Sequence, residues 1–258
     1  MDLPTNTFKR AIATGRRQLG LWSQIGHPAV TEILGDARPD WVLIDTEHAP
    51  IELPGVMEQL RVLERSGVAA LVRPAWNDAV IFKRLLDSGA QTLLVPYVQS
   101  ADEARRAVAA TRYPPDGNRG VAVVHRANRY GRVEDYAKRA ASEICVLVQI
   151  ETRAAADRLE EIAAVDGVDG VFIGPSDLAA ALGHLGNNRH PEVRAAIEQL
   201  GARAMKAGTP IGILATVETD AKAFFEMGFT FVAVASDLGL LRKATDDVVG
   251  RFREHEGR

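Results

Sequence analysis

The sequence has little cysteine and no long apolar segment, and each absence excludes a class of protein. The one cysteine, Cys145, has no partner for an internal disulfide. With no cysteine cluster and no closely spaced histidine pair, we expect no closed structural zinc site. No apolar run approaches the length of a transmembrane helix, and the opening residues MDLPTNTFKR lack the apolar segment of a signal peptide. We therefore expect a cytoplasmic protein.

An excess of positive charge is also missing. The formal net charge is -3, the sequence pI is about 6.1, and no dense stripe of Lys and Arg interrupts this balance. A general attraction to nucleic acid or to anionic lipid is therefore not expected. The 258 residues are 47% hydrophobic, enough for a large core. The expected partner is a small molecule.

Short apolar segments suited to buried strands alternate with helix-like segments along the whole chain, which is the pattern of a parallel sheet covered by helices. We count eight such segments, which indicates a (β/α)8 barrel forming one domain over residues 1–258. A doubly wound sheet is the rival, but LWSQIGHPAV lacks its glycine-rich nucleotide turn. The predicted strands are LGLWSQI from Leu19, WVLIDTE from Trp41, AALVRP from Ala69, TLLVPYV from Thr92, CVLVQIE from Cys145, GVFIGP from Gly170, PIGILAT from Pro210 and FVAVASD from Phe231.

Polar side chains gather where several of these strands end, and barrel active sites lie at the carboxyl ends of the strands. In VLVQIET the period-2 spacing of Gln149 and Glu151 points both side chains to one face of their strand. A buried carboxylate needs a partner. The polar residues at the strand ends are Asp45, Glu47, His48, Arg73, Gln149, Glu151, Ser176 and Asp177.

Glu151 and Asp177, on adjacent predicted strands, suit a hard divalent cation. Two such carboxylates repel each other unless a cation lies between them, and Mg²⁺ or Mn²⁺ accepts oxygen ligands readily. The alternative is that Glu151 pairs with Arg73 and that Asp177 caps a helix beginning at Leu178. Spacing alone leaves both interpretations open.

Five segments together resemble the hydroxy ketoacid aldolases, the class II pyruvate aldolases typified by 4-hydroxy-2-oxoheptanedioate aldolase and 2-dehydro-3-deoxyglucarate aldolase. The resemblance covers nearly the whole chain. It implies a metal-dependent barrel that reversibly cleaves a 4-hydroxy-2-oxo acid to pyruvate and an aldehyde, usually as a homohexamer. It also assigns the metal, Mg²⁺, Mn²⁺ or Co²⁺, to Glu151 and Asp177. The segments are WVLIDTEHAP, LVRP, VLVQIET, GVFIGPSDLAAALG and YPPDGNRGVAVVHRANRYG.

Three residues receive catalytic roles. Arg73 cannot lose its proton and is suited to stabilise the charge of the pyruvate enolate. His48 is the candidate base for the C4 hydroxyl, since imidazole titrates near neutral pH. By resemblance, His48 forms a dyad with Asp87, whose carboxylate would fix the imidazole tautomer. A structural histidine and a late-helix charge are the ordinary alternatives.

The remaining assignments concern substrate binding. Gln149 and the backbone N–H of Ser176 are expected to bind pyruvate. Asp45 orients the catalytic groups or meets the aldehyde's hydroxyls, with structural pairing as the alternative. Trp22 and Leu214 are expected to wall the aldehyde pocket, although such residues are more often plain core. By resemblance, the long segment containing Val121 reaches a neighbouring subunit's site.

Four other functions are alternatives to the metal-dependent aldolase. A Schiff-base aldolase needs a lysine in the barrel, whereas every lysine falls in a helix-like or terminal segment. A phosphate-binding barrel is disfavoured because Asp237 follows the last strand. An acyl-CoA lyase of the citrate lyase beta type would share the metal carboxylates and stays an alternative. A non-catalytic metabolite-binding barrel is another.

Overall fold

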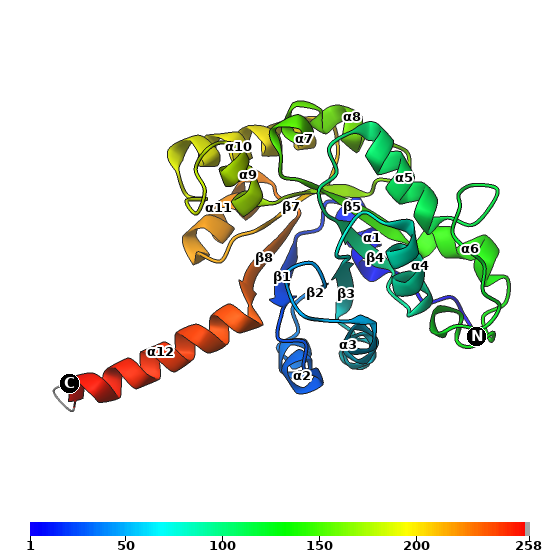
Figure 1. Cartoon of the computed structure of the whole chain (residues 1–258), viewed down its shortest axis with the longest axis horizontal. Helices are drawn as coiled ribbons and strands as arrows, with labels where there is room; N and C mark the ends of the chain where they lie inside the picture. The colour runs from blue at the N-terminus through cyan, green and yellow to red at the C-terminus, as the bar shows by residue number, and fades with distance from the viewer. Residues whose placement is uncertain (256–258) are drawn as a thin grey trace.

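The computed structural model describes residues 1–255, and it confirms the predicted (β/α)8 barrel. Eight parallel strands pair in chain order and close the sheet between β8 and β1 (Figure 1). Each strand lies within or directly beside its predicted segment. The predicted single domain over 1–258 includes residues 256–258, which lie outside the described residues. The strands are β1 Gln18–Ser23, β2 Trp41–Asp45, β3 Ala69–Arg73, β4 Thr92–Val95, β5 Cys145–Ile150, β6 Gly170–Ile173, β7 Ile211–Leu214 and β8 Phe231–Ser236.

Helices connect the strands and cover the outside of the barrel. Local signals set their ends: the Asp78 carboxylate accepts the first free N–H groups of α4, and α3 ends where Gly67 adopts a φ of 73°. They are α1 Thr7–Ala13, α2 Pro28–Asp36, α3 Leu53–Ser66, α4 Ala79–Asp87, α5 Ala101–Thr111, η1 Arg126–Asn128, α6 Tyr136–Glu143, α7 Arg153–Asp157, α8 Leu159–Ala163, α9 Pro175–Ala181, α10 Pro191–Lys206, α11 Glu218–Met227 and α12 Asp237–His255. None of them within residues 1–255 is both long and apolar enough to span a membrane. The cytoplasmic location stays a prediction.

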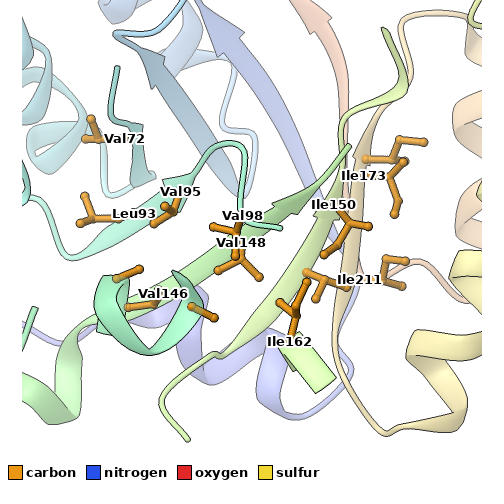
Figure 2. Close-up of a cluster of buried hydrophobic side chains, with 14 of the residues drawn as sticks. Val72, Leu93, Val95, Val98, Val146, Val148, Ile150, Ile162, Ile173 and Ile211 are labelled. Atoms are coloured by element: carbon orange, nitrogen blue, oxygen red, sulfur yellow. The ribbon is translucent and has the colours of Figure 1, made fainter. Parts of the chain in front are cut away.

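The core has two layers, because successive side chains of a strand point to opposite faces. Side chains on the outer face pack against the helices; Figure 2 shows Val146, Val148 and Ile150 of β5 in this layer. The alternate residues Cys145 and Leu147 face the barrel interior. Gln149 and Glu151 continue the interior set, as the period-2 spacing predicts, so they point into the barrel at its carboxyl end.

The opposite end of the barrel is filled by aromatic rings. Phe8 of α1 makes edge-to-face contacts with Trp41 and Phe231, at centroid distances of 6.0 and 5.5 Å. These rings fit because glycines face them: a Cβ on Gly20 would lie 2.1 Å from the Trp41 ring, and one on Gly212 would lie 2.3 Å from the Phe231 ring. The interior of the barrel at its amino-terminal end is therefore filled by packed aromatic side chains.

Two segments leave apolar side chains in solvent. Figure 1 shows α12 projecting away from the barrel. Between α5 and α6, the long segment that contains Val121 also exposes apolar side chains. Those on α12 are Leu238, Leu240, Leu241, Val248, Val249 and Phe252; those on the long segment are Val121, Val123, Val124 and Tyr130. Exposed apolar groups on this scale are typical of contact surfaces.

We expect Gly20→Ala to destabilise the fold by about 1–3 kcal/mol, because the added methyl group overlaps the buried Trp41 ring in a packed interior. Urea unfolding followed by tryptophan fluorescence measures the change. Gly250→Ala on α12 is the control, since nothing lies within 4 Å of its added Cβ and alanine favours the helix by about 1 kcal/mol. Equal stability of the two variants would contradict the role assigned to Gly20.

Candidate active site

A buried ion pair joins the carboxyl ends of β2 and β3. Arg73 Nε donates to Asp45 Oδ1 at 3.0 Å, and Arg73 Nη2 donates to Oδ2 at 2.7 Å. The pair forms because these two residues are register partners at the last position of each strand. Asp45 also accepts from Trp22 Nε1 at 3.1 Å and from the backbone N–H groups of Glu47 and His48 at 3.1 and 3.2 Å. One carboxylate thus fixes the guanidinium and the start of the following loop.

The two carboxyl groups beside Arg73 differ in pKa. Burial opposes the ionisation of Asp45, but its hydrogen bonds and its attraction to Arg73 outweigh burial and lower its pKa. For Glu47, burial dominates and raises the pKa, although Arg73 Nη1 lies 2.9 Å from Glu47 Oε2. That contact lacks the direction of a hydrogen bond, and Glu47 Oε2 has no hydrogen-bond partner. Glu47 is therefore held beside Arg73 by charge.

Glu151 is a buried carboxylate whose two oxygens are held by neutral donors. Oε1 accepts the backbone N–H of Tyr97 at 2.7 Å, and Oε2 accepts from Gln149 Nε2 at 2.6 Å. Burial, together with repulsion from Asp177 and Glu47, raises its pKa to about 7 despite the hydrogen bond from Tyr97. Tyr97 has a φ of 57°, a left-handed conformation uncommon for tyrosine, and its ring packs against Trp76 with centroids 5.6 Å apart and planes 31° apart.

Both structural alternatives for the predicted metal ligands are wrong. Glu151 does not pair with Arg73, since its side-chain partners are Tyr97 and Gln149. Asp177 is not a helix cap, because α9 already begins at Pro175 and its N-cap is Gly174. Asp177 instead lies in the first turn of α9, where its side chain is exposed.

Glu47, Glu151 and Asp177 share one electrostatic neighbourhood. Burial is the main cause of the raised pKa of both glutamates, and repulsion from Asp177 adds to it. Gly174 permits this approach: a Cβ there would lie 2.2 Å from Glu151 Oε2. Gln149 Oε1 is a buried oxygen without a hydrogen-bond partner. Like charges brought together beside oxygen ligands suit a hard divalent cation.

Two predicted pocket residues, Ser176 and Leu214, line a cavity of about 370 Å³ at the carboxyl ends of β6 and β7. Polar groups from Asn188, Arg189 and Thr216 line the same cavity. Another cavity, of about 330 Å³, lies at the amino-terminal end of the barrel and contains none of the predicted site residues. Trp22, predicted as a pocket wall, is 2% exposed and stacks under Arg73 at 5.1 Å from its ring centroid. The structure thus places Trp22 behind the guanidinium.

The predicted dyad of His48 and Asp87 is not assembled within one chain. The His48 side chain is 61% exposed, and its Nε2 lies 3.9 Å from Glu47 Oε1. Asp87 ends α4 just before β4 begins, which places it at the opposite end of the barrel. Its carboxylate accepts from Arg119 Nη2 at 2.7 Å. Arg119 stands two residues before Val121. Its bond to Asp87 therefore keeps the exposed segment that contains Val121 away from the carboxyl end of this chain's barrel.

Sequence reasoning missed three residues of this arrangement. Tyr97 contributes a backbone N–H, which no side-chain pattern reveals. Arg119 is a fully buried arginine from a loop, and its stacking on Tyr113 at 4.5 Å arises only in the fold. Gly174 could have been recognised from the sequence, since a glycine directly between a strand and Pro175 indicates a close approach of another group.

The structure thus places carboxylates and a fixed arginine at the carboxyl end of a (β/α)8 barrel, the end at which barrel enzymes have their active sites. Comparison with known proteins gives the family. The model of the HpcH/HpaI aldolase/citrate lyase family matches residues 18–244, and the chain belongs to this family.

Curated relatives and a solved structure agree with this assignment. The chain is 51% identical to 5-keto-4-deoxy-D-glucarate aldolase of Citrobacter koseri, over 98% of each chain. It is 53% identical to hydroxypyruvate/pyruvate aldolase of Sagittula stellata, over 95% of this chain and 96% of that one. A crystal structure of a family member from Burkholderia cenocepacia superimposes with a TM-score of 0.93 at 38% identity, covering 96% of this chain and all of that one. The protein is an aldolase, a carbon–carbon lyase, and the binding-only alternative is wrong.

We expect Asp45→Asn to cost about 3–5 kcal/mol of stability, because it leaves the buried Arg73 without its closest anion. The control is Asp102→Asn, which breaks an exposed ion pair with Arg105 and should cost no more than about 1 kcal/mol. Urea unfolding at neutral pH measures both.

The pH dependence supplies a second check on Asp45. Because its pKa is lowered in the folded state, the stability it contributes is complete above 3.8 and declines as the pH falls through the lower folded value. The difference in the free energy of unfolding between wild type and Asp45→Asn should therefore become smaller in acid. If this difference stayed constant down to the pH at which the protein unfolds, charge pairing would not be its source.

Proposed function

We propose that the chain is a divalent-metal-dependent aldolase that reversibly cleaves 4-hydroxy-2-oxo acids to pyruvate and an aldehyde. The observation that carries the proposal is the set of carboxylates at the carboxyl end of the barrel, Glu151, Asp177 and Glu47, which act on one another electrostatically. Glu47 also lies 2.9 Å from Arg73. Glu151 and Asp177 would hold Mg²⁺, Mn²⁺ or Co²⁺. When bound, such an ion supplies a Lewis acid for the keto oxygen.

Arg73 stabilises the charge that cleavage creates. Breaking the C3–C4 bond leaves an electron pair on C3 of pyruvate, delocalised onto the keto oxygen. A guanidinium held by Asp45 and backed by the Trp22 ring is preorganised, so it needs no rearrangement when the charge develops. Gln149 Oε1 and the N–H groups in the first turn of α9, including that of Ser176, lie at the same end of the barrel and suit the binding of pyruvate.

His48 removes the proton from the C4 hydroxyl. Its exposed ring at the mouth of the barrel can accept that proton as the C4–O bond becomes the aldehyde carbonyl. We propose that Asp87 reaches this histidine from a neighbouring subunit, because both Asp87 and Val121 lie away from this chain's own strand ends and are linked through Arg119. The neighbour's carboxylate would then orient the imidazole.

The exposed apolar surfaces support a homo-oligomer, which we propose is a hexamer. Side chains such as Leu241 and Phe252 of α12, at 58% and 68% exposed, would gain stability by burial against another copy. Val121 and Val123, at 68% and 80% exposed, give a second contact surface beside Asp87.

The aldehyde is proposed to be polar. The cavity beside Ser176 and Leu214 offers the amide of Asn188, the guanidinium of Arg189 and the hydroxyl of Thr216, which suit hydroxyl or carboxylate groups. Candidate substrates therefore include 5-keto-4-deoxy-D-glucarate and 4-hydroxy-2-oxoheptanedioate. Pyruvate release across a panel of 4-hydroxy-2-oxo acids with charged, hydroxylated and plain aldehyde portions tests this proposal. A preference for plain aliphatic aldehydes would contradict it.

Activity should require a divalent ion and no lysine imine. Each lysine lies on a helix outside the barrel strands. EDTA should abolish pyruvate release and Mg²⁺, Mn²⁺ or Co²⁺ should restore it, whereas borohydride added with pyruvate should leave the enzyme active. Covalent trapping of pyruvate on a lysine would overturn the mechanism.

The same metal site gives a test by substitution. Glu151→Gln, Asp177→Asn and Gly174→Ala should each weaken Mn²⁺ binding by roughly 10- to 100-fold, the last because its methyl group displaces the Glu151 carboxylate. Gly55→Ala is the matched control, since its Cβ makes only an ordinary 3.5 Å contact. Titration of Mn²⁺ by electron paramagnetic resonance gives the affinities. Unchanged affinity in Gly174→Ala, with the fold intact, would remove Glu151 from the metal site.

Arg73 and His48 should affect different reactions. Arg73→Ala should reduce both aldol cleavage and oxaloacetate decarboxylation by on the order of a hundredfold or more, because both form the pyruvate enolate. His48→Ala should reduce cleavage by about 10²- to 10⁴-fold and spare most decarboxylation, since carbon dioxide leaves without that base. Pyruvate release from each substrate measures the two rates. Equal losses in His48→Ala would assign His48 to the enolate or to the shape of the site.

A site shared between subunits should show complementation. His48→Ala and Asp87→Ala chains, co-expressed with different tags and purified as mixed oligomers, should cleave substrate faster than either variant alone, because some sites combine an intact His48 with an intact Asp87. Light scattering of the wild type gives the number of subunits. Mixed oligomers no more active than the average of the two variants would contradict a dyad built from two chains.

A further inference from the structure

Two histidines and a glutamate gather on the segment between α9 and α10, apart from the carboxylate site. One ligand atom from each of His184, His190 and Glu192 lies within 4.8 Å of the others. His184 Nε2 is 2.8 Å from Glu192 Oε2, and the two imidazole rings stack with centroids 3.6 Å apart and planes 15° apart. The two histidines are six residues apart, the smallest spacing of any histidine pair in the sequence.

We infer that His184, His190 and Glu192 form a second metal site, selective for zinc and similar transition-metal ions. Two imidazoles and one carboxylate are the ligand set that suits Zn²⁺, Ni²⁺ or Co²⁺, whereas Mg²⁺ prefers oxygen ligands alone. The site is therefore chemically distinct from the all-oxygen set of Glu151 and Asp177. The fourth position is open to water.

Helix capping explains only part of this geometry. His190 is the N-cap of α10, and its Nδ1 accepts the backbone N–H of Glu192 at 3.2 Å. His27 caps α2 in the same way, with Nδ1 3.2 Å from the N–H of Ala29, and it also precedes a proline. The His27 cap shows that this role needs neither a second imidazole nor a carboxylate. At His190 the capping bond uses Nδ1 and leaves Nε2 to bind an ion.

The surroundings favour a cation. Glu192 supplies a carboxylate to the cluster, with Oε2 2.8 Å from His184 Nε2. Nearby Arg189 is engaged by Asp220, with Arg189 Nε 3.2 Å from Asp220 Oδ2. One ligand atom of each residue already lies within 4.8 Å of the other two, so an ion between them would make three bonds.

Metal binding would join the segment between α9 and α10 to the first turn of α10. The segment also carries Asn188 and Arg189, which line the cavity beside Ser176 and Leu214. An ion that joins His184 to His190 and Glu192 closes the loop that holds those two residues. Zn²⁺ should therefore raise the melting temperature in addition to binding, because the assembled cluster binds it more tightly than the unfolded chain does.

The test measures zinc binding to the untagged full-length chain by calorimetry, with Mg²⁺ saturating. We expect one more Zn²⁺ equivalent in wild type than in His184→Gln or His190→Asn, and an affinity at this site at least about tenfold weaker in either variant. Asparagine keeps the helix cap at position 190, so loss of binding is not loss of the fold. Co²⁺ at the same site should give visible d–d absorption that both variants lose.

The matched control is His27→Asn, which removes a capping histidine of the same geometry without a cluster. It should retain the full zinc stoichiometry and the Zn²⁺-dependent rise in melting temperature. Mg²⁺-dependent aldol cleavage should be unchanged in His184→Gln, since this cluster takes no part in the reaction. If His184→Gln and His190→Asn bind the same number of Zn²⁺ ions with the affinity of His27→Asn, the cluster is only a cap and a hydrogen bond.

Discussion

The buried pair of Asp45 and Arg73 is the interaction on which the catalytic end of the barrel depends. A charge taken out of water must be paired and hydrogen-bonded, and here a single carboxylate accepts from the guanidinium, from the Trp22 indole and from two backbone N–H groups. The same bonds that neutralise the charge also set the direction of the loop carrying Glu47 and His48. Removing the charge therefore disturbs positioning and stability together.

The two ends of the barrel differ in composition: one is packed with apolar side chains and the other holds charged groups. At the amino-terminal end, Phe8, Trp41 and Phe231 fill the interior, and the glycines opposite the last two make room for the rings. At the carboxyl end, charged groups replace apolar ones, and burial together with like charges raises the pKa of Glu47 and Glu151. The packed end provides stability, and the polar end retains an unpaired oxygen, Gln149 Oε1, where barrel enzymes bind their ligands.

The fold could be predicted because its signals are local. Strand periodicity and the helix-like segments between them determine a parallel barrel, and the parity of Gln149 and Glu151 follows from the strand alone. The positions of Arg73, Glu151 and Asp177 at strand ends follow from the same reasoning. Contacts between distant segments could not be predicted, such as the bond from the Tyr97 backbone to Glu151 or the pairing of Asp87 with Arg119. The direction of α12 also has no local signal, since the helix pattern is the same whether its apolar face meets its own barrel or another copy.

The hydrogen bond from Tyr97 to Glu151 uses the backbone N–H, so the tyrosine side chain takes no part in anchoring the carboxylate. It is the backbone of Tyr97 that holds Glu151, while the ring, 40% exposed, packs against Trp76 at the rim of the barrel. The side chain at position 97 can therefore change, in evolution or in a directed search for new aldehyde acceptors, while the carboxylate beneath it keeps its place. The left-handed φ of 57° favours replacements that tolerate this conformation, such as glycine and asparagine.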